Sequence, residues 1–191
     1  MNYYDYINII KGTPETQGLE YDKAVMWLHP EKLPLGVVSL NGCSDKIIRI
    51  PKTAVNSYGK EVAVIGIGCD AFQGNTTVTD VILHPGIRMV GGSTFKGCTA
   101  LERIYFPRQI KRISKYMFSG CSSLTDVYYE GSYEEWKKLE KPTEKRVKVF
   151  GKLVPGTPVQ VVISDKIVRT AGIESLCLAT IHFNCDYPKQ V

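Results

Sequence analysis

One pattern is written three times in this chain, as Ile67-Gly-Cys-Asp-Ala-Phe-Gln-Gly-Asn75, Val90-Gly-Gly-Ser-Thr-Phe-Lys-Gly-Cys98 and Ile113-Ser-Lys-Tyr-Met-Phe-Ser-Gly-Cys121. Each copy begins 23 residues after the previous one. The spacing continues in three further sets of apolar residues: Val78, Leu101 and Leu124; Val81, Ile104 and Val127; and Leu83, Phe106 and Tyr129. Whole units repeated at a fixed period predict a stacked protein, in which each unit buries its apolar side against its neighbours.

The positions within the repeat indicate what each one does. Apolar residues that alternate, as at Val81 and Leu83, have the period of a strand with one buried face. The Gly that ends each copy's Phe-x-Gly suits a tight corner with positive φ. The next position holds a small residue that can hydrogen-bond to backbone groups of the stacked units, so we expect Asn75 and its equivalents to face inward. The interior should be filled by one aromatic column: Phe72, Phe95 and Phe118.

These three copies resemble the BspA-type leucine-rich repeats found in many bacterial proteins. The resemblance covers about residues 36–139, and residues 179–184 match the pattern more weakly. It implies a surface that binds other proteins, and it brings no catalytic residues to this chain. Two positions depart from the family pattern: His84 stands where Pro is usual, and Asn75 stands where Cys is usual.

The period and the resemblance together predict an α/β, strand-rich leucine-rich-repeat solenoid with 23-residue coils. With 191 residues, the chain has the length of a single domain. We divide residues 1–191 into an N-terminal cap at 1–35, the solenoid at 36–139 and a C-terminal cap at 140–191. Such caps are expected because an open end would expose a strand edge and apolar core.

The N-terminal cap has two parts. Residues 1–12 have the spacing of a short helix, although Tyr3, Tyr4 and Tyr6 could instead form part of a binding surface. Residues 13–35 read as irregular structure packed on the first coil. Strand-like runs at 37–40 and 47–50, with a turn between them at Asn41-Gly42, then lead into the repeats.

The C-terminal cap begins with a helix. Ser132-Tyr-Glu-Glu135 is a capping box, which predicts a helix that runs to about Glu140 and covers the end of the core. Strand-like runs follow at 159–163 and 179–183, with a possible short turn around residues 172–176 between them.

The chain lacks the features of an exported or membrane-spanning protein. No basic residue precedes Lys11, Asn8 breaks the first apolar run, and no run approaches the length of a membrane span. We therefore expect a cytoplasmic protein, or a cell-surface protein if a leader has been removed. The chain has six cysteines, and we expect six free thiols because side chains on stacked coils run parallel instead of converging.

No set of residues indicates catalysis, a metal or a cofactor. His29, His84 and His182 are isolated from one another in sequence, and there is no C-x-x-C or H-E-x-x-H. Gly66-Ile-Gly-Cys-Asp-Ala71 matches a dinucleotide-binding pattern, but a corner and another strand follow it where a helix would be needed. We expect no enzyme activity, no cofactor and no small-molecule substrate.

Charge is the clearest functional signal. Residues 86–152 contain 14 Lys and Arg against 7 Asp and Glu, while the rest of the chain has 10 against 12. The period places Arg88 beside Lys111 on the next coil. Solvated Lys and Arg are also normal on strand edges, so the excess alone does not require a partner. We define the basic stripe as six candidate partner-binding residues: Arg88, Arg103, Arg108, Lys111, Arg112 and Lys115.

Two kinds of partner fit the basic stripe. The first is another protein with an acidic surface, which the positive charge would attract and orient. The second is nucleic acid, or a nucleic-acid-handling enzyme that a small phage or mobile-element inhibitor would block. Aromatic residues are not clustered among the basic ones as single-strand binding requires, so the protein partner is favoured. Binding to phosphates should fall steeply with salt, which separates the two hypotheses.

Overall fold

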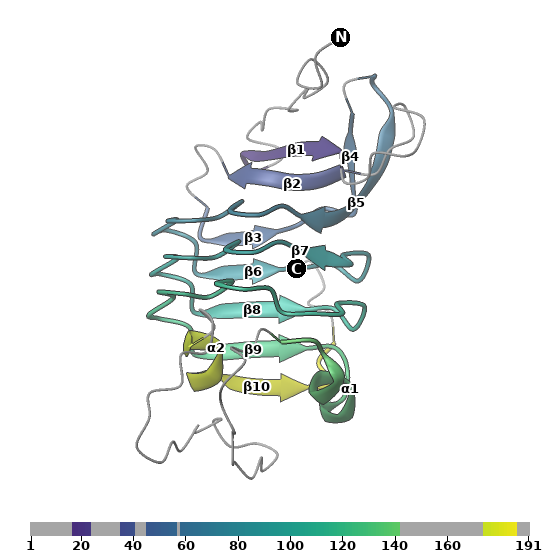
Figure 1. The fold of residues 1–191 in the computed structure, drawn as a ribbon. Coiled ribbons are helices and arrows are strands. Elements are labelled where there is room, and N and C mark those ends of the chain that lie inside the picture. Colours follow the sequence, from purple (N-terminus) through teal and green to yellow (C-terminus); the bar gives the residue numbers. More distant parts are fainter. Residues whose placement is uncertain (1–16, 24–34, 41–44, 57, 142–173, 187–191) are drawn as a thin grey trace, which may run out of the picture.

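The computed structural model describes residues 17–23, 35–40, 45–56, 58–141 and 174–186. Within them the strands stack along one axis, and two short helices lie near the C-terminal end of the stack (Figure 1). The elements in chain order are β1 Leu19–Lys23, β2 Leu35–Leu40, β3 Ile47–Arg49, β4 Thr53–Val55, β5 Glu61–Ile67, β6 Asp80–Ile82, β7 Met89–Val90, β8 Arg103–Phe106, β9 Asp126–Tyr129, α1 Tyr133–Lys138, α2 Glu174–Leu178 and β10 Thr180–Phe183.

One of the two five-stranded sheets, called the front sheet here, has the strand order β10-β9-β8-β6-β3 and only parallel pairs. Val81 pairs with Ile104, and Ile104 pairs with Val127, so each partner lies 23 positions further along the chain. Together with Ile48 these residues form an inward-facing row with 0% exposure. Residues at equivalent positions of the repeat are therefore spatial neighbours in this sheet, as the spacing predicts.

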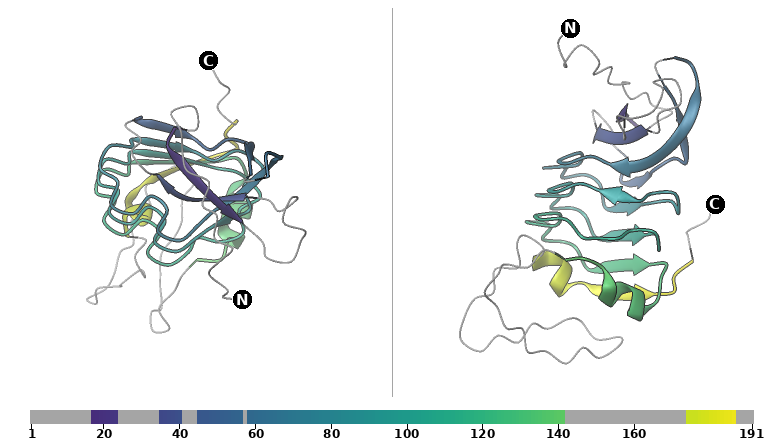
Figure 2. Two further views of the ribbon diagram at one scale, coloured as in Figure 1. Left: turned by 90° about the horizontal axis from the view of Figure 1, so that it is seen from above. Right: turned by 45° about the vertical axis from the view of Figure 1, so that its right-hand side comes forward.

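A second sheet has the order β1-β2-β5-β4, and β7 also pairs with β5. β5 connects them, because it runs parallel to β2 and β7 and antiparallel to β4. β4 and β5 form a hairpin near the N-terminal end of the stack (Figure 2). Asn56 closes its tip, since its Oδ1 accepts hydrogen bonds of 3.0 Å from the N–H groups of Tyr58 and Lys60.

The interior column and the corners agree with the sequence analysis. The ring centroids of Phe72 and Phe95 lie 5.4 Å apart, and those of Phe95 and Phe118 lie 5.6 Å apart. The S–H groups of Cys98 and Cys121 donate to the carbonyls of Phe72 and Phe95, both at 2.9 Å. The corner glycines have positive φ: Gly74 at 74°, Gly97 at 73° and Gly120 at 77°.

The C-terminal end of the core is covered by α1, as the capping box predicts. Glu135 N–H donates to Ser132 Oγ, and Ser132 N–H donates to Glu135 Oε2. The helix buries Trp136 and ends at Lys138, two residues earlier than expected. Lys141 Nζ then donates at 2.6 Å to the Trp136 carbonyl, which satisfies an acceptor of the last turn.

Three local expectations are wrong. Residues 13–35 include strand β1, whose Leu19 and Tyr21 are buried as it pairs with β2. The turn expected around 172–176 is replaced by helix α2. Asn75 does not enter the interior row, because its Oδ1 is an acceptor and takes the N–H groups of Thr77 and Val78 in its own turn.

Other expectations lie outside the described residues: the helix at 1–12, the turn at 41–42 and the strand at 159–163. The strands predicted at 37–40, 47–50 and 179–183 are present as β2, β3 and β10. β2 and β3 enter different sheets.

Candidate protein-binding surface

The basic stripe is divided between two sides of the molecule. Arg103 begins β8 in the front sheet, whereas Arg88 immediately precedes β7 in the second sheet. The front-sheet position is set by register, since Arg103 pairs with Asp80 on one side and with Asp126 on the other. A cation in this row is therefore placed between two carboxylates.

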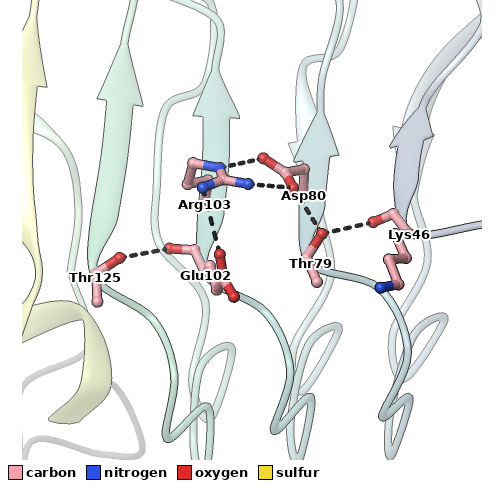
Figure 3. A network of polar contacts seen from close by, with 6 residues as sticks. All are labelled: Lys46, Thr79, Asp80, Glu102, Arg103 and Thr125. Carbon is pink, nitrogen blue, oxygen red and sulfur yellow. Dashed lines mark hydrogen bonds and ion pairs between the residues drawn. The ribbon is translucent and has the colours of Figure 1, made fainter.

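Arg103 is held in a polar network on the front sheet (Figure 3). Its Nε bonds to Asp80 Oδ1, its Nη2 donates at 2.9 Å to Asp80 Oδ2, and its Nη1 lies 3.3 Å from Glu102 Oε2. Thr79 Oγ1 donates at 2.7 Å to the same Asp80 carboxylate. Such a two-point contact fixes the guanidinium group, which is then poorly placed to reach a partner.

The pKa values reflect this pairing. Burial opposes ionisation of Asp80, but the hydrogen bonds from Arg103 and Thr79 outweigh it, and the pKa of Asp80 lies below its usual value. The hydrogen bond to Asp80 raises the pKa of Arg103. On the next strand, His182 pairs with Tyr128, and its Nε2 lies 2.7 Å from Asp126 Oδ1; this contact lowers the pKa of Asp126. The charges of the front sheet are thus largely satisfied within the sheet.

Arg108 is also engaged. Its backbone N–H donates at 3.0 Å to Glu130 Oε2, and its Nε lies 3.3 Å from Glu135 Oε2 at the start of α1. The side chain is 54% exposed, so the ion pair is solvated and easily exchanged. Arg108 therefore belongs to the junction between the last full repeat and the helix that covers it.

The remaining four residues of the basic stripe are exposed and form what we call the back cluster: Arg88, Lys111, Arg112 and Lys115. Among the described residues, none of the four side chains makes an ion pair or a hydrogen bond. Backbone bonds hold the segments in place: Arg88 N–H donates to the Ile65 carbonyl, and the Lys111 and Lys115 carbonyls accept from Glu140 and Ser93.

Two large exposed side chains accompany the back cluster. Met89 follows Arg88 and is 48% exposed, and Tyr116 follows Lys115 and is 49% exposed. Tyr116 has a φ of 57°, the left-handed region that an aromatic residue rarely adopts. Ser93, one repeat earlier, and Asp70, two repeats earlier, have the same conformation, so the corner itself requires it. Exposed Met, Tyr and Arg are residues that protein interfaces favour.

The chemistry that an active site would need is not assembled in the described ranges. No three His, Cys, Asp or Glu side chains there form a group that could hold a metal ion. No helix in those ranges is long and apolar enough to cross a bilayer. A pocket of about 10 Å³, room for about one water molecule, is lined mainly by Leu83, Tyr105, Phe106, Pro107, Tyr128 and Cys185.

Sequence reasoning missed two things at this surface. The period that aligns Arg88 with Lys111 also aligns Asp80 with Arg103, so the ion pair was predictable from the same spacing. Nothing in the sequence indicates that Met89 and Tyr116 are exposed, because Met and Tyr are as common in cores as on interfaces. The five cysteines in the described ranges are free thiols, and Cys69 is the exposed one.

Comparison with known proteins supports the resemblance. Residues 55–139 match the family model of the BspA type leucine rich repeat region, in six copies. A leucine-rich repeat protein from Bacteroides capillosus is 18% identical with a TM-score of 0.50, over 63% of this chain and 80% of that one, and it shows the shared fold. A leucine-rich repeat protein from Bacteroides ovatus is 25% identical with a TM-score of 0.48, over 57% of this chain.

The chain spans 30% of the length of the Bacteroides ovatus protein. The leucine-rich repeat protein of T. pallidum is 18% identical with a TM-score of 0.44, over 67% of this chain and 52% of that one. No curated protein matches the chain.

Proposed function

Because residues 55–139 form a BspA-type leucine-rich-repeat region, we propose that the chain is a non-catalytic module that binds an acidic surface of another protein. In this proposal the chain is a capped solenoid with 23-residue coils, whose caps are residues 1–35 and 140–191. The stack acts as a rigid support, and the back cluster supplies the contact. No reaction is part of the proposal.

The observation that supports this surface is the contrast in pairing within the basic stripe. Arg103 and Arg108 are engaged by Asp80 and Glu135, whereas the back cluster is exposed and has no side-chain partner among the described residues. Free cations attract an acidic partner and raise its rate of association. Met89 and Tyr116 add the apolar contact area that a protein partner needs and a phosphate backbone does not.

The test compares two charge reversals of equal size. We expect Lys111→Glu with Lys115→Glu to abolish capture of the partner from nuclease-treated extract of the source cell. Lys52→Glu with Lys60→Glu, which reverses two exposed lysines at the β4–β5 hairpin, should leave the same protein bound. Quantitative mass spectrometry of the captured proteins, at low and high salt, provides the measurement.

Two results would contradict the proposal. Undiminished capture by the Lys111→Glu and Lys115→Glu protein would place the site elsewhere, with the N-terminal tyrosines as the next surface to examine. Binding of an oligonucleotide that falls by orders of magnitude between low and physiological salt, with no protein captured, would favour the nucleic-acid alternative.

A further inference from the structure

The front sheet ends at β10, and the edge of this strand is chemically unprotected. β10 pairs with β9 and is the last strand in the order of the sheet (Figure 1). Natural edge strands are usually guarded by lysine, proline, an inward charge or a bulge. Thr180-Ile-His-Phe183 has neither lysine nor proline, and its register with β9 is continuous. The strand therefore has the features of a template for further pairing.

Burial shows that one layer is missing above β10. Ile104 and Val127 are 0% exposed because strands lie on both sides of them, whereas Ile181 in the same row is only half-buried. The next inward row behaves alike, since Tyr129 is 1% exposed and Phe183 is half-buried. An additional strand would complete the burial of Ile181 and add to that of Phe183, whose ring already contacts Tyr133 and Trp136 of α1.

The backbone of the sheet indicates which groups that strand would meet. Ile50 N–H donates at 3.0 Å to the Ile82 carbonyl, and Leu83 N–H donates at 3.1 Å to the Tyr105 carbonyl, each on the following strand. Phe183 occupies the same row as Leu83. No described strand follows β10, so the Phe183 N–H faces the open edge. The alternation of a strand gives the Ile181 N–H the same direction.

The outward side of the sheet adds a third requirement. Tyr105 stacks on Tyr128 at 4.5 Å, and Tyr128 stacks on His182 at 4.6 Å. Asp126 holds the His182 ring in this position through the 2.7 Å contact with Nε2. No described ring lies on the other face of His182, so the aromatic column ends with a face that can accept one more planar side chain.

From these rows we infer that the β10 edge binds an extended segment of a partner protein as an added parallel strand. The segment places an aliphatic residue beside Ile181, a planar residue on the His182 ring and a large apolar residue beside Phe183. Main-chain hydrogen bonds give the affinity, and the three alternating positions give the selectivity. This edge is separate from the back cluster, so either site can fail without the other.

The chain's own repeat supplies a suitable probe. Residues 124–130, Leu-Thr-Asp-Val-Tyr-Tyr-Glu, hold the required order at Val127, Tyr128 and Tyr129. We expect a fluorescent peptide of this sequence to bind the full chain, and a scrambled peptide of the same composition not to bind. Fluorescence anisotropy measures both, up to about 1 mM, the weak end of specific binding.

Backbone methylation of the peptide gives a matched control on unaltered protein. Asp126 N–H donates at 3.1 Å to the carbonyl of Glu102, the residue before β8, and the Tyr128 N–H shares that direction by alternation. An N-methyl group at the Tyr128 position should therefore weaken binding to β10 about tenfold. The same group at the Tyr129 position faces away and should leave the affinity unchanged.

A pair of protein variants tests the edge from the other side. Ile181→Pro removes the N–H that faces the open edge and is compatible with an edge strand. It should reduce peptide binding, while Ile181→Val keeps the N–H and should bind as the parent does. Charge reversal at Lys111 and Lys115 should not affect this peptide.

Four results would overturn the inference. The first two concern the peptide: no saturable binding, or equal affinities for the two methylated peptides. The other two concern the free chain: a dimer by sedimentation, or strong protection of the Ile181 and Phe183 amides from hydrogen exchange. The third would show that a second copy occupies the edge, and the fourth that the chain's own residues do.

Discussion

Arg103 and Arg88 are both arginines of the repeat region, yet they belong to opposite environments. Arg103 lies in a row of the front sheet where carboxylates precede and follow it, and Asp80 binds it through two oxygens. Arg88 lies on the other side of the stack, beside Met89, and its side chain has no described partner. The same residue type is a structural link on one side and an available charge on the other.

This contrast shows that stacking determines the role of a charge. In a repeat structure the neighbours of a residue are the residues at the same position in adjacent units. Asp80, Arg103 and Asp126 alternate in sign along their row, so they neutralise one another. Arg88 and Lys111 have the same sign at equivalent positions, so their fields add and face outward.

The largest expected effect is on stability, and it tests whether the side of the stack that carries the back cluster is packed as tightly as the front sheet. A Cβ added at Gly91 would lie 2.4 Å from the backbone N of Cys69, whereas one added at Gly92 would lie 3.4 Å from the Lys115 carbonyl. We expect Gly91→Ala to cost about 3 kcal/mol or more of unfolding free energy, and Gly92→Ala about 1 kcal/mol or less. Urea denaturation measures both, and equal losses would show that this side is loosely packed.

The next effect tests the pairing itself. Asp80→Ala removes the buried carboxylate that holds Arg103, and we expect a loss of about 2 kcal/mol in unfolding free energy. Arg88→Ala removes a solvated cation and should change it by less than about 0.5 kcal/mol. Thermal unfolding of the two variants compares them directly. If they lose the same stability, the division between structural and available arginines is wrong.

A pH titration probes the boundary between the two sheets at His84. Its Nδ1 accepts a hydrogen bond from Gly86 N–H, and burial lowers its pKa below the usual 6.5, with Lys52 acting in the same direction. The unfolded chain therefore binds the proton first, and stability should fall as the pH drops below 6.5, by no more than about 1.4 kcal/mol per pH unit. Stability above pH 7 should be unaffected by this residue.

The control for the pH effect is His84→Asn, which can still accept from Gly86 but does not titrate. We expect the slope of unfolding free energy between about pH 5 and 6.5 to flatten in this variant, since Asp80 and Asp126 titrate only at lower pH. An unchanged slope would assign the dependence to another group.

The smallest expected effect concerns the corner beside the back cluster. Tyr116→Asn should raise unfolding free energy by about 0.5 kcal/mol, because Asn tolerates positive φ better than Tyr. The same change at Tyr58, which is similarly exposed on the β4–β5 hairpin but lacks positive φ, should bring no such gain. If Tyr116→Asn also weakens partner capture, the strained tyrosine belongs to the binding surface.

The sequence predicted the features that the repeat encodes. The Phe column, the corner glycines and the rows of the front sheet all follow from one spacing, because equal positions become neighbours. The helix after Glu130 was also predictable, since Ser132 and Glu135 form a purely local capping box. In each case the information lies either within one turn of chain or in a regular period.

The features that were missed are those without a period or a local signal. The β4–β5 hairpin occurs once, and β1 depends on pairing with β2 across a gap in sequence. Tyr116 gave no indication of positive φ, because the corner imposes it on whichever residue is there. Arg103 looks like any other member of the basic stripe until the period is also applied to the acidic residues, which aligns it with Asp80.

The rate at which the interior thiols are modified reports how often the stack opens. Burial raises the pKa of Cys98 to about 12 and that of Cys121 to about 11, so neither is a reactive thiolate while the coils remain closed. Cys69 is exposed on the same repeats and can be alkylated without any opening. The delay between modification of Cys69 and of the two interior cysteines would therefore time how often neighbouring repeats separate, with no label added to the chain.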